Sequence, residues 1–286
     1  MLTILLDGVA YGMLLFVLAV GLSVTLGLMN FINLAHGAFA MAGGYIAVVL
    51  VNQIGVPFFM ALPLVFAGTA LVGVVVERTL YVHVYSKSHL DQVLFTIGLV
   101  FMAVSAVDYF VGSHQQFIDL PAILRQRYEV FGAGIGAYRI FIILVCGALA
   151  VTLQLILSRT RFGAQLRAGV DNRAVARGLG INVGLVFTVT FAVGSGLAGL
   201  GGALGAEFLG LDPNFPLKFL VYFLIVVAVG GTSSLTGPFV AAILLGIADV
   251  AGKYYVPAFG AFVTYTLMVV VLIWRPHGLF APGDAK

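Results

Sequence analysis

The chain has 286 residues, of which 62% are hydrophobic and only 9% are charged, and its formal net charge is +3. A mean hydropathy of +1.13 excludes a water-soluble domain of this size, because such a domain would expose large apolar patches. Apolar runs of about 18 residues or more recur along the whole chain, a pattern typical of membrane-spanning helices and not of barrel strands. The sequence therefore predicts an all-α polytopic transmembrane helix bundle in the lipid bilayer, with residues 1–286 as a single domain.

The basic residues lie in short connections between the apolar runs, so they indicate helix flanks and not a nucleic-acid surface. The first Lys or Arg is Arg78, so the N-terminus lacks the basic region of a cleaved signal peptide and is expected to be a retained span. The single cysteine, Cys146, lies within an apolar run and is expected to pack as a small core residue.

About nine spans are predicted, and roughly 8 to 10 are compatible with the pattern. They lie near 4–28, 36–53, 57–77, 92–112, 138–157, 183–206, 217–231, 235–252 and 257–274. With a cytoplasmic C-terminus, nine of the 14 Lys and Arg residues, Lys286 among them, fall on the inside and five on the outside. This excess favours that orientation and places the N-terminus, with Asp7, outside.

Two polar interruptions break the apolar pattern. The first, 29–37, carries Asn30, Asn33 and His36, and the second, "GGTSSLTGP" at 230–238, follows an unusually short apolar run. Such breaks often line a translocation pathway, because polar backbone is tolerated at membrane depth only against protein or water. Ordinary tight turns at the membrane surface are the alternative. We place Asn30, Asn33 and His36 in the pathway, where they either contact solute or only hold the helix break.

Small residues recur at every fourth position of the span 183–206. This spacing lets helix backbones approach closely, which favours a central helix or a subunit contact over a direct role with substrate. Ser195 of the same span is a further candidate for the pathway. The residues expected to serve helix packing, here and at the second break, are Gly194, Ala198, Gly202, Gly230 and Gly231.

The connection 158–182, "SRTRFGAQLRAGVDNRAVARGLGIN", predicts a short amphipathic helix on the cytoplasmic side. Asp171 is the expected N-cap, Arg173 and Arg177 lie one turn apart, and Gly178 and Gly180 end the helix. Such a helix is too short to be stable alone, so a cytosolic partner is expected to pack against it. A solvated loop whose arginines only set the topology is the alternative.

Five motifs in this order resemble one family over essentially the full length. They are "GLSVTLGLMNFINLAHGAFAMAGGY", "ERTLYVHVYSKSHLDQVLFTIGL", "TRFGAQLRAGVDNRAVARGLGIN", "GGTSSLTGPFVAAILLG" and "RPHGLF". The chain resembles a permease subunit of the branched-chain amino-acid ABC uptake transporters. Ala164 and Gln165 depart from the family pattern, as do Ser233 and Ala241, which replace common glycines.

The resemblance implies a prokaryotic inner-membrane importer. Its partners would be a second homologous permease, two ATP-binding cassette subunits and an extracytoplasmic solute-binding protein. ATP would be bound by the ATPase subunits, and this chain would need no cofactor. By resemblance, the short cytoplasmic helix is the coupling helix, and its candidate ATPase contacts are Arg167, Asp171, Asn172, Ala174, Arg177, Gly180 and Ile181.

Other function classes have weaker support. The Gly252–Lys253 pair lacks the remainder of a P-loop, so ATP would have to be used by another chain. An ion-coupled secondary transporter would need a buried carboxylate, for which Asp108 and Asp249 are the candidates. An enzyme is not expected, because Ser195 has no histidine in its own span.

A metal site is not expected either, since His83 and His89 are more simply explained as solvated side chains. The extracytoplasmic segment 113–137 and the loop 207–216, with Glu207 and Asp212, would face the binding protein. A neutral aliphatic amino acid is the first expectation for the cargo, and urea, amides and small carboxylates are the alternatives.

Overall fold

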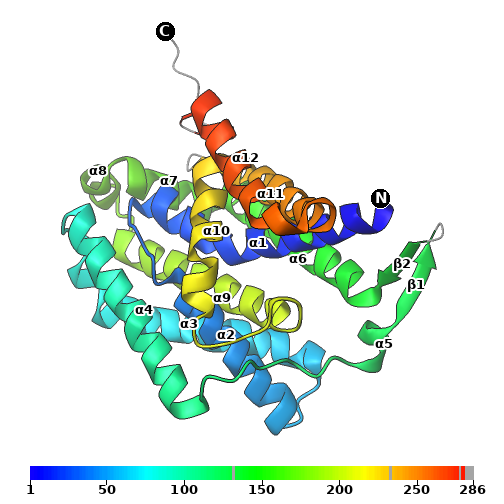
Figure 1. Cartoon of the computed structure of the whole chain (residues 1–286). Coiled ribbons are helices and arrows are strands. Elements are labelled where there is room, and N and C mark those ends of the chain that lie inside the picture. Colours follow the sequence, from blue (N-terminus) through cyan, green and yellow to red (C-terminus); the bar gives the residue numbers. More distant parts are fainter. Residues whose placement is uncertain (131–132, 232–233, 277, 281–286) are drawn as a thin grey trace.

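The computed structural model describes residues 1–130, 133–231, 234–276 and 278–280. Ser233 and Lys286 lie outside these residues. The described chain is a bundle of helices with one small β-hairpin (Figure 1). Six helices are long and apolar enough to cross a membrane: α1 (Leu2–Met29), α3 (Phe58–Thr79), α4 (His89–Val111), α6 (Ala137–Arg159), α9 (Val183–Leu209) and α11 (Thr236–Tyr255).

Three further apolar helices are shorter: α2 (His36–Val48), α10 (Phe215–Gly230) and α12 (Gly260–Trp274). A π-helical turn, Val49–Gln53, continues α2, and a 3-10 turn, Pro257–Phe259, precedes α12. Each predicted span coincides with one of these helices, so the expected all-α polytopic bundle is confirmed.

Helices α1 and α9 form the centre of the bundle. In the most apolar stretch of each, 83% of α1 and 72% of α9 is buried, whereas only 11% of α4 is buried. Glycines allow the close approach: a Cβ on Gly12 of α1 would lie 2.6 Å from the Ala242 carbonyl oxygen of α11. The outer faces of α3, α4 and α6 remain apolar and exposed, as is suitable for lipid or for another membrane subunit.

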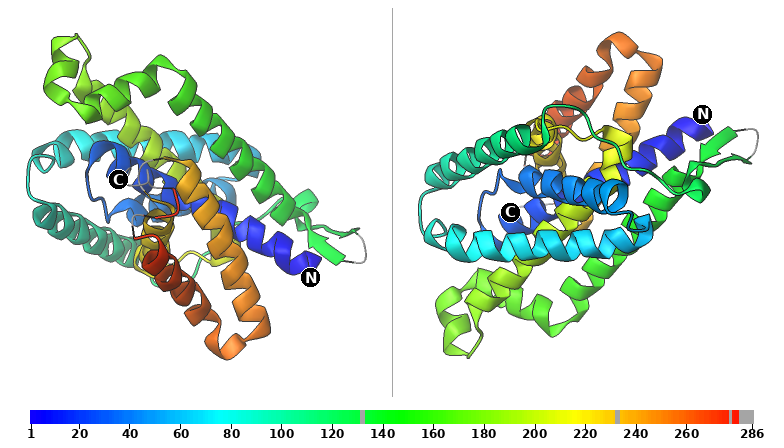
Figure 2. Two further views of the ribbon diagram at one scale, coloured as in Figure 1. Left: turned by 90° about the horizontal axis from the view of Figure 1, so that it is seen from above. Right: turned by 90° about the horizontal axis from the view of Figure 1, so that it is seen from below.

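Polar elements extend from opposite ends of the bundle (Figures 1 and 2). At one end are α7 (Arg161–Asp171), α8 (Arg173–Gly178) and the short 3-10 turn Tyr81–His83. At the other are α5 (Ala122–Arg125) and the antiparallel hairpin of β1 (Arg127–Val130) and β2 (Ala133–Gly136). The sequence did not predict α7 or the hairpin, which lies inside the expected extracytoplasmic segment 113–137.

Candidate functional site

The break between α1 and α2 begins at Asn30. This residue ends α1 in the left-handed conformation, with φ of 50°, and its backbone N–H donates to the Thr25 carbonyl oxygen. Asparagine is one of the few residues other than glycine that adopts this conformation readily. Its side chain is exposed, so Asn30 ends the helix without itself being buried in the bundle.

The backbone after Asn30 re-enters the bundle without helical structure, and α4 supplies its hydrogen-bond partners. The Ile32 N–H donates to Gln92 Oε1 at 3.2 Å, and the Leu34 N–H donates to Thr96 Oγ1 at 3.3 Å. Gln92 and Thr96 are both buried. Because an unpaired N–H at membrane depth is costly, these two side chains make the broken segment possible.

Asn33 and His36 close the other side of the break. The Tyr81 hydroxyl donates to Asn33 Oδ1 at 2.9 Å, and His36 Nε2 lies 2.8 Å from the Leu18 carbonyl oxygen. Since a carbonyl only accepts, His36 Nε2 carries the proton of this bond. α2 thus begins beside the middle of α1. Both side chains are engaged within the chain, and their contact with solute stays a prediction.

The other predicted pathway and packing residues lie at helix contacts. A Cβ on Gly73 of α3 would lie 2.6 Å from the Ser195 side chain, so Ser195 faces α3. A Cβ on Gly202 would lie 1.8 Å from the Ala40 carbonyl oxygen of α2. Gly194 lies against Gly21 of α1, and Ala198 is fully buried.

The turn between α10 and α11 also requires glycines. A Cβ on Gly230 would lie 2.3 Å from the Pro238 nitrogen, and Gly231 has φ of 84°. The Leu279 N–H donates to the Val229 carbonyl oxygen at 2.8 Å, which brings the segment after α12 to the same turn.

Neither carboxylate considered for ion coupling is both buried and unpaired. Asp108 is exposed near the end of α4. Asp249 is buried but accepts from Lys253 Nζ at 2.6 Å and from Thr264 Oγ1 at 3.2 Å. Its charge is balanced within the chain, so it joins α11 to α12.

The connection 158–182 forms two helices instead of the one expected. Thr160 is the N-cap of α7, because its Oγ1 accepts from the Gly163 N–H, and Asp171 is the last residue of this helix. The cap of α8 is Asn172, whose Oδ1 accepts from the Ala174 and Val175 N–H groups, both at 3.1 Å. The prediction of Asp171 as N-cap is therefore wrong by one residue. Gly180 has φ of 83° and follows the end of α8, as expected.

α8 has an outward and an inward side. Val175 and Leu179 are 57% and 76% exposed. Arg173 turns toward the bundle, where its guanidinium lies 4.9 Å from the centre of the Phe187 ring and Nη2 donates to the Met29 carbonyl oxygen at 3.4 Å. α8 is thus attached directly to the last residue of α1.

The predicted ATPase contacts are mostly accessible. Arg167 is exposed and donates to the Leu157 carbonyl oxygen at the end of α6, and Ile181 is half-buried. The remaining candidates are all exposed: Asp171, Asn172, Ala174, Arg177 and Gly180. Their role stays a prediction.

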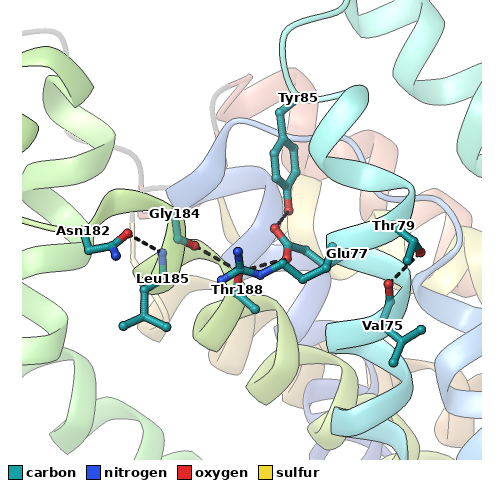
Figure 3. Close-up of polar contacts among 9 residues, drawn as sticks. Val75, Glu77, Thr79, Tyr85, Asn182, Gly184, Leu185 and Thr188 are labelled. Carbon is teal, nitrogen blue, oxygen red and sulfur yellow. Dashed lines mark hydrogen bonds and ion pairs between the residues drawn. The ribbon is translucent and has the colours of Figure 1, made fainter.

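A buried carboxylate near α8, that of Glu77, was not predicted from the sequence as a candidate site (Figure 3). Glu77, at the end of α3, is only 2% exposed. Its Oε1 accepts from the Tyr85 hydroxyl at 3.1 Å and its Oε2 from Thr188 Oγ1 of α9 at 2.9 Å. Burial, and secondarily the Glu77 charge, raise the pKa of Tyr85 well above its usual value, so its hydroxyl remains a donor. In the sequence, Glu77 and Arg78 have the pattern of ordinary charges at the end of a membrane helix. The tyrosines four and eight residues later, Tyr81 and Tyr85, were the available signal that Glu77 has polar partners.

The described residues contain no group of three or more His, Cys, Asp or Glu side chains placed to hold a metal ion. His83 and His89 are both exposed.

Comparisons of the sequence with known proteins identify its family. The sequence pattern of the family described as "Branched-chain amino acid transport system / permease component" matches residues 4–272. The permease BraD of Pseudomonas aeruginosa, named for high-affinity branched-chain amino acid transport, is 27% identical over 99% of this chain and 96% of its own length. LivH of Escherichia coli, of the same description, is 24% identical over 98% and 95%.

A tyrosine transport system permease protein of Clostridioides difficile is 25% identical over 77% of this chain and 70% of its own length. No solved structure matches the chain. These relatives are membrane transport components and not enzymes. With a family match over residues 4–272 of its 286, the chain belongs to the branched-chain amino acid transport system permease components.

Proposed function

We propose that the chain is the translocation subunit of a binding-protein-dependent ABC importer in the inner membrane, and that its cargo is a branched-chain or another neutral amino acid. The names of its relatives support an amino acid as cargo, but they include both branched-chain amino acids and tyrosine. The exact side chain of the cargo is therefore open, and urea, amides and small carboxylates remain the alternatives.

The observation that carries this proposal is the pair of helices α7 and α8 at one end of the bundle (Figure 1). α8 presents two exposed apolar side chains, Val175 and Leu179, on a polar end of the protein. An exposed apolar pair on a short, capped helix fits a docking contact with another protein. The relation of its family to ABC transport makes an ATPase subunit the natural partner.

The assignment of α8 to the ATPase contact also implies how the chain is oriented in the membrane. α7 and the segment after α12 lie at the same end, because Arg167 and Leu235 line one cavity and Leu279 bonds to Val229. If α8 contacts a cytosolic ATPase, the C-terminus is cytoplasmic. The N-terminus and the hairpin of β1 and β2 then face the extracytoplasmic binding protein. A second permease would complete the transport path beside this chain, and two ATPase subunits would bind below the pair.

The mechanism we infer starts with ATP-driven movement of the ATPase subunits against α8. Arg173 transmits this movement, because it joins α8 to Phe187 of α9 and to the Met29 carbonyl oxygen of α1. Met29 immediately precedes the helix break. A displacement of α8 therefore acts next to the non-helical segment between α1 and α2, whose backbone donates hydrogen bonds to side chains of α4. We infer that the bundle changes there between outward-facing and inward-facing states.

The test is ATP-dependent uptake of labelled leucine by proteoliposomes that contain the chain and its partner subunits. In the variant Val175→Asp/Leu179→Asp, both substituted side chains are exposed, so we expect a folded permease that no longer co-purifies with the ATPase and does not support uptake. The matched control is Ile123→Asp, an exposed apolar residue of α5 at the opposite end, which should keep ATPase association. Uptake driven by an ion gradient without ATP, or normal ATPase association in the double variant, would contradict the proposal.

A further inference from the structure

A cavity of about 250 Å³ lies between the ends of α3 and α9 and beneath α8. Glu77, Tyr85 and Thr188 form its polar floor, and Figure 3 shows the Tyr85 and Thr188 side chains meeting at the Glu77 carboxylate. Arg173 and Arg177 of α8 also line the cavity. The cavity is therefore shared by α3, by the central helix α9 and by the helix that we assign to ATPase contact.

We propose that this cavity binds a free amino acid with a small apolar side chain from the cytoplasmic side, and that the bound amino acid slows transport. The inference rests on the proposed function, because it takes the imported amino acid as its ligand and α8 as the coupling helix. Three chemical features of the cavity support this choice of ligand.

The first feature is a carboxylate that could accept from an ammonium group. A carboxylate has about four lone-pair sites. The Tyr85 and Thr188 hydroxyls use one each, and Arg78 Nε lies 3.7 Å from Oε2. Glu77 therefore retains acceptor capacity toward the cavity. An ammonium group there would also compensate a carboxylate that burial otherwise disfavours.

The second feature is an excess of positive charge. Three guanidinium groups, those of Arg78, Arg173 and Arg177, share the cavity with a single carboxylate, Glu77. Within the described residues, the Arg177 side chain has no hydrogen-bond or ion-pair partner. Arg173 bonds through Nη2 only, so other N–H groups of its planar fork remain available. Arginines of this kind bind carboxylates strongly and often in bidentate fashion.

The third feature is an apolar wall made of Val82, Val183 and Phe187. The arginines can donate to the carboxylate of an amino acid, Glu77 can accept from its ammonium group, and the apolar wall can contact its side chain. The cavity therefore matches the three parts of an aliphatic amino acid. A phosphate or a fatty acid would satisfy the arginines but would place a second anion beside Glu77. The buried carboxylate thus favours a zwitterion over a simple anion or an anionic lipid headgroup.

A ligand in this cavity would connect α8 to α3 and α9. By binding one arrangement of α8 more tightly than others, it would stabilise that arrangement and resist the movement that drives transport. The cytosolic amino acid would then limit its own import.

The experiment uses the complete transporter in proteoliposomes that enclose ATP with or without leucine, and measures initial uptake of labelled leucine supplied outside with its binding protein. For each variant, the readout is the ratio of the two rates, so a change in the basal rate cancels. In the wild type we expect enclosed leucine to lower the rate about fivefold or more, the lower end of ordinary allosteric coupling. The variants Glu77→Gln and Val82→Phe, the second of which fills the cavity without removing a charge, should bring the ratio close to one.

Two controls identify the ligand and the site. Arg159→Gln alters an exposed arginine that does not line the cavity and should keep the wild-type ratio. Enclosed 4-methylpentanoate, which is leucine without its amino group, should not inhibit because Glu77 repels it. Inhibition by 4-methylpentanoate, or inhibition that persists in Val82→Phe, would overturn the inference. If the wild type shows normal uptake and enclosed leucine does not change its rate, only the inference is overturned. If the wild type shows no ATP-dependent uptake, the proposed function is contradicted as well.

Discussion

Removing one hydroxyl group from the helix break tests whether the break is held as the structure indicates. Tyr81 is fully buried, and its hydroxyl donates to Asn33 Oδ1 at 2.9 Å. In Tyr81→Phe, the ring keeps its edge-to-face contacts with Phe31 and Phe95, so the change removes a hydrogen bond with little loss of packing.

The expected magnitude follows from two ranges. Side-chain hydrogen bonds between membrane helices contribute about 0.6 kcal/mol on average and about 1.7 kcal/mol at most. Leaving a buried acceptor without its donor costs about 1–3 kcal/mol. Asn33 is only 1% exposed, so water cannot easily replace the tyrosine. We therefore expect Tyr81→Phe to lower the free energy of unfolding by about 1.5 kcal/mol, where the two ranges overlap.

The assay is equilibrium unfolding of the purified permease in bicelles, with Tyr109→Phe as the matched control. Tyr109 is 83% exposed, so loss of its hydroxyl should change the free energy by less than about 0.5 kcal/mol. The double variant Tyr81→Phe/Asn33→Leu removes both partners and should be more stable than the sum of the two single changes predicts. Equal effects of Tyr81→Phe and Tyr109→Phe would refute the structural role assigned to this bond.

Two further changes test the close packing of α9 and the attachment of α8. Gly202→Ala would place a Cβ 1.8 Å from the Ala40 carbonyl oxygen, so we expect a loss of about 1–3 kcal/mol in the same unfolding assay. Gly98→Ala, with open space around it, should cause no loss, and equal effects would contradict the packing argument. Arg173→Lys loses the planar contact with Phe187, worth about 1 kcal/mol, so we expect the leucine transported per ATP hydrolysed to fall about fivefold. An unchanged ratio, with normal ATPase association, would show that Arg173 does not transmit movement.

The sequence was sufficient to predict the bundle because long apolar runs have few alternatives to helical spans in lipid. It also located the break at 29–37, since Asn30, Asn33 and His36 interrupt such a run. The sequence could not identify the side chains that accept hydrogen bonds from the backbone of the break. Those partners, Gln92 and Thr96 among them, lie about 60 positions along the chain, and only the packing of α4 brings them close.

The segment 158–182 was harder to predict because its signals are local and short. Asp171 and Asn172 are adjacent, and both residue types are good N-caps, so composition alone does not separate them. The structure selects Asn172 because α7 continues through Asp171. α7 itself contains Gly163 and Gly169, which lower helix propensity. Both glycines are buried, and a Cβ on Gly163 would lie 2.0 Å from the Leu157 carbonyl oxygen, so tertiary packing overrides propensity there.

Glu77 of α3 and Arg173 of α8 place charged groups against the ends of the two central helices, α9 and α1. A rigid apolar contact between α8 and the bundle would hold one arrangement firmly, whereas bonds to Arg173 could break and re-form in the movement that we propose for α8. The Met29 carbonyl oxygen that Arg173 contacts belongs to the last turn of α1, where helix carbonyls lack partners within the helix. The broken connection between α1 and α2 thus provides both the acceptor that α8 holds and the short segment that can respond when α8 is displaced.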